Sequence, residues 1–285
     1  MSRYSIVIPA YNEEGAIGSV LEEILKLEPK NPFEVVVVDD CSTDATAAQA
    51  EKYPVRLIRN VQNFGYGYSL KRGIRESTGD TIIILDADGS YPVASLTTLL
   101  GEYEKGFDMV VGARQGSQYH GSLIKRIARF FFRVLSEFAT GRRIPDINSG
   151  YRIFRKDVAT RFFHTLSSGF SFTTTITLAF MLNAYSVRYV SVPYHKRKGA
   201  SKVRYLRDTL RSTQIIVEAI VFYNPLKIFL LCAGAVFITG LLSVVLSLWL
   251  PAIASLLFLT VALTVSIFAI GLIAVLLRFI YVDRP

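Results

Sequence analysis

The stretch Thr81-Ile-Ile-Ile-Leu-Asp-Ala-Asp88 runs from an apolar, β-branched segment directly into two carboxylates. We expect Thr81–Asp86 to be a strand buried on both faces, because its apolar residues are continuous rather than alternating. Asp86 and Asp88 then emerge at its carboxyl end, one residue apart and pointing the same way. Four other segments have strand character: Tyr4–Pro9, Val35–Asp39, Val55–Arg59 and Met109–Gly112.

Helical patterns lie between these strands, at Ile17–Leu27, Ala45–Lys52, Tyr68–Glu76 and Val93–Glu104. Strand–helix alternation predicts an α/β fold, with a mainly parallel sheet, right-handed connections and helices on both faces. In such a sheet ligands bind beyond the carboxyl ends of the strands. Polar residues recur at those ends: Asn12-Glu13, Asp39-Asp40, Asp86-Ala-Asp88 and Arg114.

The C-terminal part of the chain has no charged residue between Lys227 and Arg278. About 20 apolar residues span a bilayer, so we predict a transmembrane hairpin within residues 225–285, with helices at about 226–248 and 252–277. A buried core hairpin is the alternative, but core helices rarely run this long without polar residues. Basic residues at both outer ends place both chain ends and the N-terminal domain in the cytoplasm, as in a multi-pass protein of the cell membrane.

The charged part is expected to divide into a globular domain over residues 1–200 and an amphipathic helix over 201–224. A further amphipathic helix at about 119–140 alternates basic residues with Phe130-Phe-Phe132. Both helices suit the headgroup plane of a membrane; the alternative is two ordinary surface helices. The net charge is +9, and the basic residues crowd the segments 125–156 and 196–211. This placement favours an anionic membrane surface over nucleic acid.

The paired carboxylates Asp86 and Asp88 predict a site for Mg²⁺ or Mn²⁺ that leaves positions for diphosphate oxygens. A solvated loop is the alternative for this short motif, but its place opposite Asp39-Asp40 favours the metal. The glycines of Asn63–Gly67 invite a dinucleotide-binding interpretation, which fails because Leu70 stands at the third glycine position. They instead predict a turn before a helix whose Lys71 or Arg72 could approach phosphate.

Six motifs occur in the order seen in family 2 glycosyltransferases: Ile8-Pro-Ala-Tyr-Asn-Glu13, Val38-Asp-Asp-Cys-Ser-Thr-Asp44, Asp86-Ala-Asp88, Val111-Gly-Ala-Arg114, Asn148-Ser-Gly-Tyr-Arg152 and Gly199-Ala-Ser-Lys202. The chain most resembles the polyprenyl-phosphate and dolichyl-phosphate sugar synthases, over about residues 4–205. The resemblance implies a GT-A fold and an inverting, metal-dependent transfer from a nucleotide-sugar to a polyprenyl or dolichyl phosphate.

The resemblance also implies roles for individual residues. The nucleotide would be bound by Pro9, Ala10, Tyr11, Asn12, Glu13, Asp39 and Asp40. The metal ion would be held by Asp86 and Asp88, which form the catalytic set together with Arg114 and Lys202. The acceptor phosphate would be met by Lys125, Arg126, Arg129 and Arg152. The expected partners are therefore the sugar donor, the lipid acceptor and the membrane, with a homo-oligomer possible and no nucleic acid.

Two departures from the mannose synthases bear on the donor. Ser90 stands where they usually have Gln, and Phe172-Thr-Thr-Thr175 replaces an acidic pair. Both favour a UDP-hexose or UDP-N-acetylhexosamine over GDP-mannose. Two alternatives are a processive polysaccharide synthase and an inactive nucleotide-sugar-binding scaffold. The first would need a Gln-x-x-Arg-Trp motif, whereas the one tryptophan is Trp249; intact Asp86, Asp88 and Arg114 argue against the second.

Overall fold

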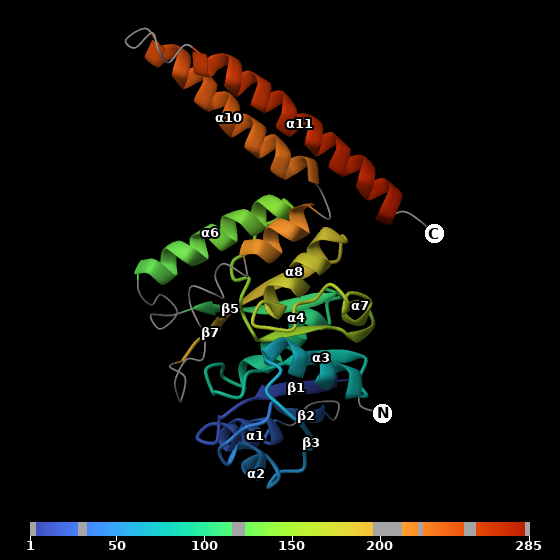
Figure 1. The fold of residues 1–285 in the computed structure, drawn as a ribbon. Coiled ribbons are helices and arrows are strands. Elements are labelled where there is room, and N and C mark those ends of the chain that lie inside the picture. The colour runs from blue at the N-terminus through green and yellow to red at the C-terminus, as the bar shows by residue number, and fades with distance from the viewer. Residues whose placement is uncertain are drawn as a thin grey trace. The chain divides into compact units, whose positions relative to one another are not determined.

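The structure, a computed structural model, describes residues 4–27, 33–115, 123–195, 213–221, 225–247 and 255–282 (Figure 1). For residues 123–129, 131, 246–247, 255–258 and 278–282 it describes the backbone only. The chain divides into two compact units, Met1–Thr213 and Gln214–Pro285.

The first unit contains a seven-stranded sheet in the order β3-β2-β1-β4-β6-β5-β7. The strands are β1 (Tyr4–Ala10), β2 (Phe33–Asp39), β3 (Arg56–Arg59), β4 (Thr81–Ile84), β5 (Met109–Gln115), β6 (Arg152–Arg155) and β7 (Val187–Pro193). All five predicted strands are present, with ends shifted by one to three residues. β6 and β7 are additional. The sheet is mainly parallel, as predicted, and mixed because β6 runs antiparallel to both of its neighbours.

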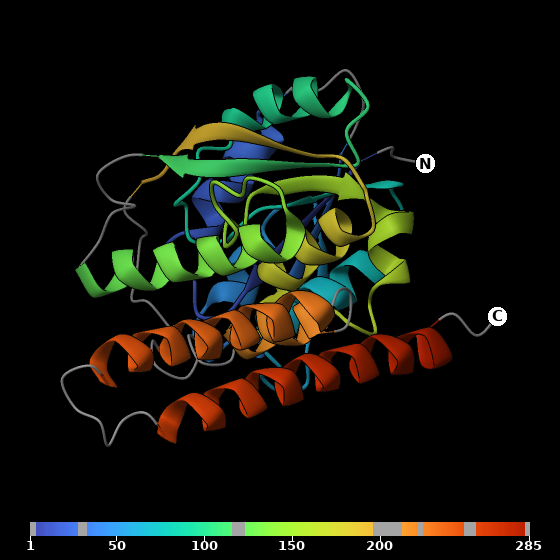
Figure 2. The same cartoon turned by 90° about the horizontal axis from the view of Figure 1, so that it is seen from above.

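Helices cover both faces of this sheet, as predicted (Figure 2). Alternate residues of β1 separate the two layers, because Ile6 and Ile8 face one layer and Val7 the other. The layer facing Ile6 contains α1 (Ile17–Leu25), α2 (Thr46–Ala50) and α4 (Ser95–Tyr103). The opposite layer contains α3 (Tyr66–Glu76), α7 (Lys156–Arg161) and α8 (Phe172–Leu182).

Helix α3 lies unusually close to the sheet, and Gly73 makes this possible. A Cβ at position 73 would lie 2.5 Å from Val7 Cγ1 and 2.9 Å from Val38 Cγ2. A larger residue would therefore push α3 away from β1 and β2. Because α3 begins at the edge where the carboxylates emerge, this contact also positions the first residues of the helix. The long helix α6 (Leu123–Thr140) packs on α8 and lies within the predicted amphipathic segment at 119–140.

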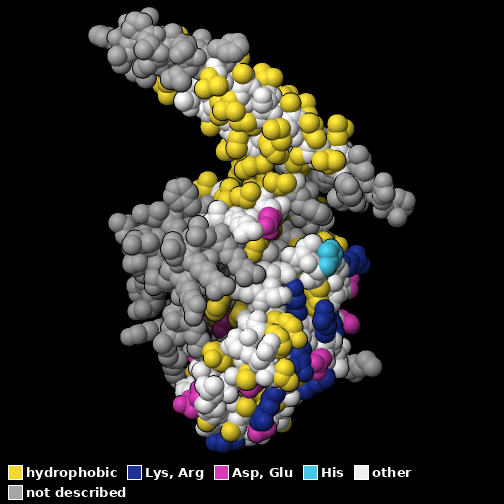
Figure 3. Space-filling view, viewed as in Figure 1, with side chains coloured by type: hydrophobic (Ala, Val, Ile, Leu, Met, Phe, Trp, Pro, Cys, Tyr) yellow, Lys and Arg dark blue, Asp and Glu magenta, His cyan; other side chains and the backbone are white. Residues whose placement is uncertain are grey.

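The second unit is a pair of long apolar helices, α10 (Pro225–Ser247) and α11 (Ser255–Val282), packed against each other. The two helices pack closely at two glycines. Thr260 packs against Gly240 and Phe229 against Gly271, and a Cβ at either glycine would lie 2.6 Å from the opposing side chain. Most of their apolar side chains are exposed (Figure 3). Both helices are long and apolar enough to cross a membrane, over Pro225–Val245 and Leu259–Leu277.

This pair matches the predicted hairpin, whose turn at 249–251 lies outside the described residues. Of the predicted amphipathic helix at 201–224, residues 213–221 are helical, and 201–212 and 222–224 lie outside the described part of the chain.

Candidate active site

The strand order brings the predicted site segments to one edge of the sheet. β1 is paired in parallel with β2 on one side and β4 on the other, so Pro9–Glu13, Asp39-Asp40 and Asp86–Asp88 all follow strands that end there. β6 lies between β4 and β5 and is antiparallel to both. Arg114, near the end of β5, therefore reaches the same edge, and residues 146–151 enter β6 from it.

The loops after β1 and β2 are joined by hydrogen bonds from main-chain N–H groups to side-chain oxygens. Asn12, at a φ of 51°, donates its N–H to Ser42 Oγ (3.0 Å) and accepts the N–H of Thr43 at its Oδ1 (2.8 Å). Asn is among the few residues that adopt this left-handed conformation readily. The N–H of Glu13 donates to Thr46 Oγ1 (2.7 Å). Of the other predicted nucleotide-binding residues, Pro9 and Ala10 are buried within β1 and Tyr11 is half-buried.

Asp39 and Asp40 are both buried, but their carboxylates serve different loops. Asp39 accepts the N–H of Ser42, at 3.3 Å from its Oδ1. Asp40 accepts hydrogen bonds from Asn60 Nδ2 (2.6 Å) and from the N–H groups of Phe64 (3.0 Å) and Gly65 (2.7 Å). The predicted nucleotide contact of Asp40 therefore needs correction: its carboxylate is turned toward the loop before α3, where it fixes the start of that helix.

The acidic pair follows β4 as predicted, with Asp86 half-buried and Asp88 buried. Tyr66 donates its hydroxyl to Asp86 Oδ1 at 2.9 Å. On the other side, a Cβ at Gly150 would lie 2.5 Å from Asp86 Oδ2, so only glycine leaves room for the carboxylate. Asp88 Oδ1 accepts the N–H of Ser90 at 2.9 Å.

These residues fit a hard divalent cation. Mg²⁺ is commonly bound by one or two carboxylates together with substrate phosphates and water, and Asp86 and Asp88 supply that set. Within the described parts of the chain, the Ser90 hydroxyl is buried beside Asp88 without a hydrogen-bond partner. No cluster of three or more His, Cys, Asp or Glu side chains suited to a metal occurs among those same residues, so two carboxylates are the available anionic ligands.

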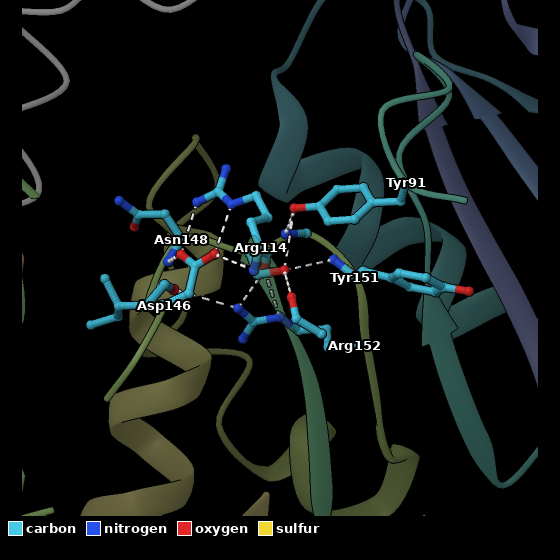
Figure 4. A network of polar contacts seen from close by, with 10 residues as sticks. Tyr91, Arg114, Asp146, Asn148, Tyr151 and Arg152 are labelled. Carbon is cyan, nitrogen blue, oxygen red and sulfur yellow. Dashed lines mark hydrogen bonds and ion pairs between the residues drawn. The ribbon is translucent and has the colours of Figure 1, made fainter. Parts of the chain in front are cut away.

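Arg114 forms a two-pronged ion pair with Asp146 (Figure 4). Its Nε lies 2.7 Å from Asp146 Oδ2 and its Nη2 2.8 Å from Oδ1. Asp146 also accepts the main-chain N–H groups of Arg114 and Asn148, each at 3.2 Å. The guanidinium carbon is 5.4 Å from the centre of the Tyr194 ring. The plane and position of this cation are therefore fixed by a buried carboxylate and an aromatic face.

The motif Asn148-Ser-Gly-Tyr-Arg152 forms the loop that closes this side of the site. Ser149 Oγ donates to the carbonyl of Gly112 (2.6 Å), and the N–H of Gly150 donates to Tyr91 Oη (3.0 Å). These bonds hold the loop against β5 and against the segment after the acidic pair (Figure 4). They place Gly150 within reach of the Asp86 carboxylate.

Arg152 does not have the predicted place. We expected it to meet the acceptor phosphate, but the whole side chain is buried. Its guanidinium donates to the carbonyls of Ser149 (2.6 Å) and Thr173 (3.1 Å) and to Thr177 Oγ1 (3.0 Å). Carbonyl oxygens thus satisfy a buried cation, which ties the start of β6 to α8. We correct its role to a structural one.

Lys71 and Arg72 donate hydrogen bonds to neighbouring parts of the chain. Lys71 donates to the carbonyl of Leu166, and burial, with the nearby charge of Arg75, lowers its pKa. Arg72 donates to the carbonyl of Arg59 and to Asn60 Oδ1. The expected phosphate contact from this helix stays a prediction.

Four predicted cations cannot be placed. Lys125, Arg126 and Arg129 belong to α6, of which the structure describes only the backbone at these positions. Lys202 lies outside the described residues. Three site residues were missed by the sequence reasoning, namely Tyr66, Asp146 and Gly150. Asp146 stands only two residues before the recognised Asn148 motif, so an acid near that motif was the signal available.

A family model described as "Glycosyl transferase family 2" matches residues 5–163. A "Dolichyl-phosphate hexose transferase" of Haloferax volcanii is 30% identical over 201 residues, covering 70% of this chain and 86% of that protein. A human "Dolichyl-phosphate beta-glucosyltransferase" is 32% identical over 190 residues, covering 57% of each.

Among solved structures, glucosyl-3-phosphoglycerate synthase of Mycobacterium tuberculosis with Mn²⁺, UDP-glucose and phosphoglyceric acid shares the fold. Its TM-score is 0.63 at 19% identity, with 77% of this chain and 80% of that one covered.

Proposed function

The chain belongs to glycosyl transferase family 2, and from that premise we propose that it transfers a sugar from a nucleotide-sugar to a polyprenyl or dolichyl phosphate. The observation that carries this proposal is the shared sheet edge, where Asp86 lies against Gly150 and Arg114 forms its ion pair with Asp146. The names of the two relatives and the apolar helix pair support a lipid acceptor.

The reaction would be a single displacement. An oxygen of the lipid phosphate attacks the anomeric carbon, and the bond from that carbon to the diphosphate oxygen breaks. The electron pair leaves with the nucleoside diphosphate, and the configuration inverts. A phosphate monoester, with a second pKa of about 6, is already anionic at neutral pH, so the attack requires no dedicated general base.

The chain's residues bind and orient the two anions. A Mg²⁺ or Mn²⁺ ion held by Asp86 and Asp88 would stabilise negative charge on the leaving diphosphate. Arg114 provides a fixed cation that reduces the repulsion between donor and acceptor phosphates. Asp146 keeps its guanidinium in one plane. Lys125, Arg126, Arg129 and Lys202 remain our proposed acceptor contacts.

We propose a UDP-hexose or a UDP-N-acetylhexosamine as donor rather than GDP-mannose. The support is the small, buried Ser90 after the acidic pair and the threonine-rich start of α8. We further propose that α10 and α11 cross the membrane and that the catalytic unit is cytoplasmic. Incubating membranes that contain the full chain with a panel of nucleotide-sugars, then analysing the lipid fraction, identifies the donor.

The central test replaces Asp88 by Asn. We expect transfer to fall at least about a hundredfold, since a catalytic metal contributes several kcal/mol. Chelator should inhibit the wild type, and Mg²⁺ or Mn²⁺ should restore it. Asp80→Asn is the matched control, because Asp80 is exposed at the opposite end of the same strand. Full activity of Asp88→Asn, or indifference to chelator, would refute metal-assisted transfer; absence of any glycolipid with all donors would refute the transferase proposal.

A further inference from the structure

Tyr66 contacts the acidic pair from the start of α3. It is the first residue of α3, and its hydroxyl donates to Asp86 Oδ1 at 2.9 Å. The preceding Gly65 has a φ of 97°, a conformation that favours glycine. Asp40 accepts the N–H of Gly65. The start of α3, and with it Tyr66, is therefore fixed relative to the end of β2.

The Tyr66 ring is also fixed from the side. It stacks on Phe170, with ring centres 6.0 Å apart and planes 9° apart. The segment carrying Phe170 is joined to α3, because the N–H of Tyr68 donates to the carbonyl of Ser168 at 2.9 Å. A Cβ at Gly67 would lie 2.5 Å from the carbonyl oxygen of Ser167, so the helix and this segment touch through their backbones. Such packing leaves the Tyr66 hydroxyl little freedom to move.

Gly150 leaves room for the Asp86 carboxylate, because it has no side chain. The carboxylate has one oxygen bonded to Tyr66 and the other 2.5 Å from the point where a Cβ of residue 150 would stand. The N–H of Gly150 is itself held by Tyr91. The Tyr66 hydrogen bond thus restricts rotation of the Asp86 carboxyl group, although the terminal torsion of an aspartate is ordinarily broad. The other oxygen occupies space that only glycine at position 150 leaves free.

We propose that Tyr66 is a positioning residue that holds the Asp86 carboxylate in the orientation required to bind the divalent cation and the donor diphosphate. This inference rests on the proposed function. A phenol suits the task because it donates a hydrogen bond without bringing a positive charge that would compete with the cation. Partners that orient metal-binding side chains typically affect metal affinity or activity by 10–100-fold, and Tyr66 stands in that relation to Asp86.

The test compares Tyr66→Phe with Tyr68→Phe in the full-length protein in detergent. Both changes remove one hydroxyl from α3 and keep the ring, but the Tyr68 ring packs on Phe64 instead of Phe170. Calorimetry would measure binding of UDP and of GDP with and without Mn²⁺. We expect Tyr66→Phe to weaken Mn²⁺-dependent nucleotide binding at least about tenfold, to leave Mn²⁺-independent binding unchanged, and to lower kcat. Tyr68→Phe should match the wild type.

The outcomes separate the two proposals. If the wild type shows no Mn²⁺-dependent binding of either nucleotide, the proposed function fails. If the wild type shows it and Tyr66→Phe binds equally well, the positioning role is overturned. Should Tyr66→Phe also melt at a lower temperature, Gly150→Ala decides, because it displaces the same carboxylate from the other side and leaves Tyr66 intact. Wild-type Mn²⁺-dependent binding in a stable Gly150→Ala protein would then refute the proposal.

Discussion

Replacing Asp146 by Ala removes the buried half of the Arg114 ion pair. The Asp146 side chain is 3% exposed and that of Arg114 is 16% exposed, so neither charge is well solvated. The substitution deletes acceptors for the Arg114 Nε and Nη2 and for the main-chain N–H groups of Arg114 and Asn148. The Arg114 guanidinium and these two main-chain donors then lose their carboxylate acceptor in a largely buried environment.

Removing one partner of a buried ion pair costs about 3–5 kcal/mol. Arg114 keeps some exposure and can turn toward water, so we expect about 3 kcal/mol. For a unit of about 200 residues, each kcal/mol lowers Tm by about 2–4 °C, which predicts a decrease of about 6–12 °C. Arg155 and Asp157 form a similar but exposed fork at 3.1 and 2.8 Å, with side chains 48% and 50% exposed. Asp157→Ala should cost less than about 1 kcal/mol.

Thermal melting of the full chain in detergent, followed by near-ultraviolet circular dichroism, measures this difference. The signal reports on tyrosines, and Tyr91, Tyr151 and Tyr194 pack edge to face beside the pair. A cycle of Asp146→Ala, Arg114→Met and the double variant then isolates the coupling, expected to exceed about 1.5 kcal/mol. A Tm decrease no larger than that of Asp157→Ala, or coupling below about 0.5 kcal/mol, would show that the pair does not hold this part of the site together.

Two further predictions concern acid stability and topology. Burial alone would raise the pKa of Glu34, but hydrogen bonds from Ser5 and Thr78 and the charge of Arg56 outweigh it and lower the pKa below its ordinary 4.5. This stabilisation is full above pH 4.5 and is lost as the pH falls through the lowered pKa. Glu34→Gln should therefore destabilise the protein by about 1 kcal/mol at pH 7 and by progressively less in acid. Equal differences in Tm between variant and wild type at pH 7 and pH 3 would contradict this reasoning. A reporter fused after Pro285 should be cytoplasmic, since basic residues flank the outer ends of the apolar helices, and an external signal would reverse the topology.

Much of the first unit could be predicted because its signals are local. Near-continuous apolar runs such as Val35–Val38 identify strands, and the acids that follow them mark the ligand-binding edge. β6 lacks such a signal: it is four residues long, with an arginine at each end. Arg152 looks like a surface residue in the sequence, because the sequence does not show that its N–H groups donate to the carbonyls of Ser149 and Thr173.

The site was harder to predict where a residue acts through another one. Asp86 and Asp88 were found from their own chemistry and position. Tyr66 and Gly150 matter only through their distance to Asp86, which depends on how α3 and the loop before β6 dock. The family resemblance assigned Asp40 to the nucleotide, yet its carboxylate accepts the N–H groups of the tight turn before α3. Neighbouring acids at one strand end can thus have separate tasks that only the tertiary contacts reveal.

The insertion of β6 between β4 and β5 has a consequence for synthesis of the chain. β1 to β4 can pair as soon as residue 84 has left the ribosome, since the order β3-β2-β1-β4 uses only those strands. β5 is made next, but it pairs only with β6 and β7. Until residues 152–155 emerge, β4 therefore presents an open edge, and open edges invite pairing with other chains. Nascent chains ending between 115 and 151 should be the most aggregation-prone, and translation pauses there the most harmful.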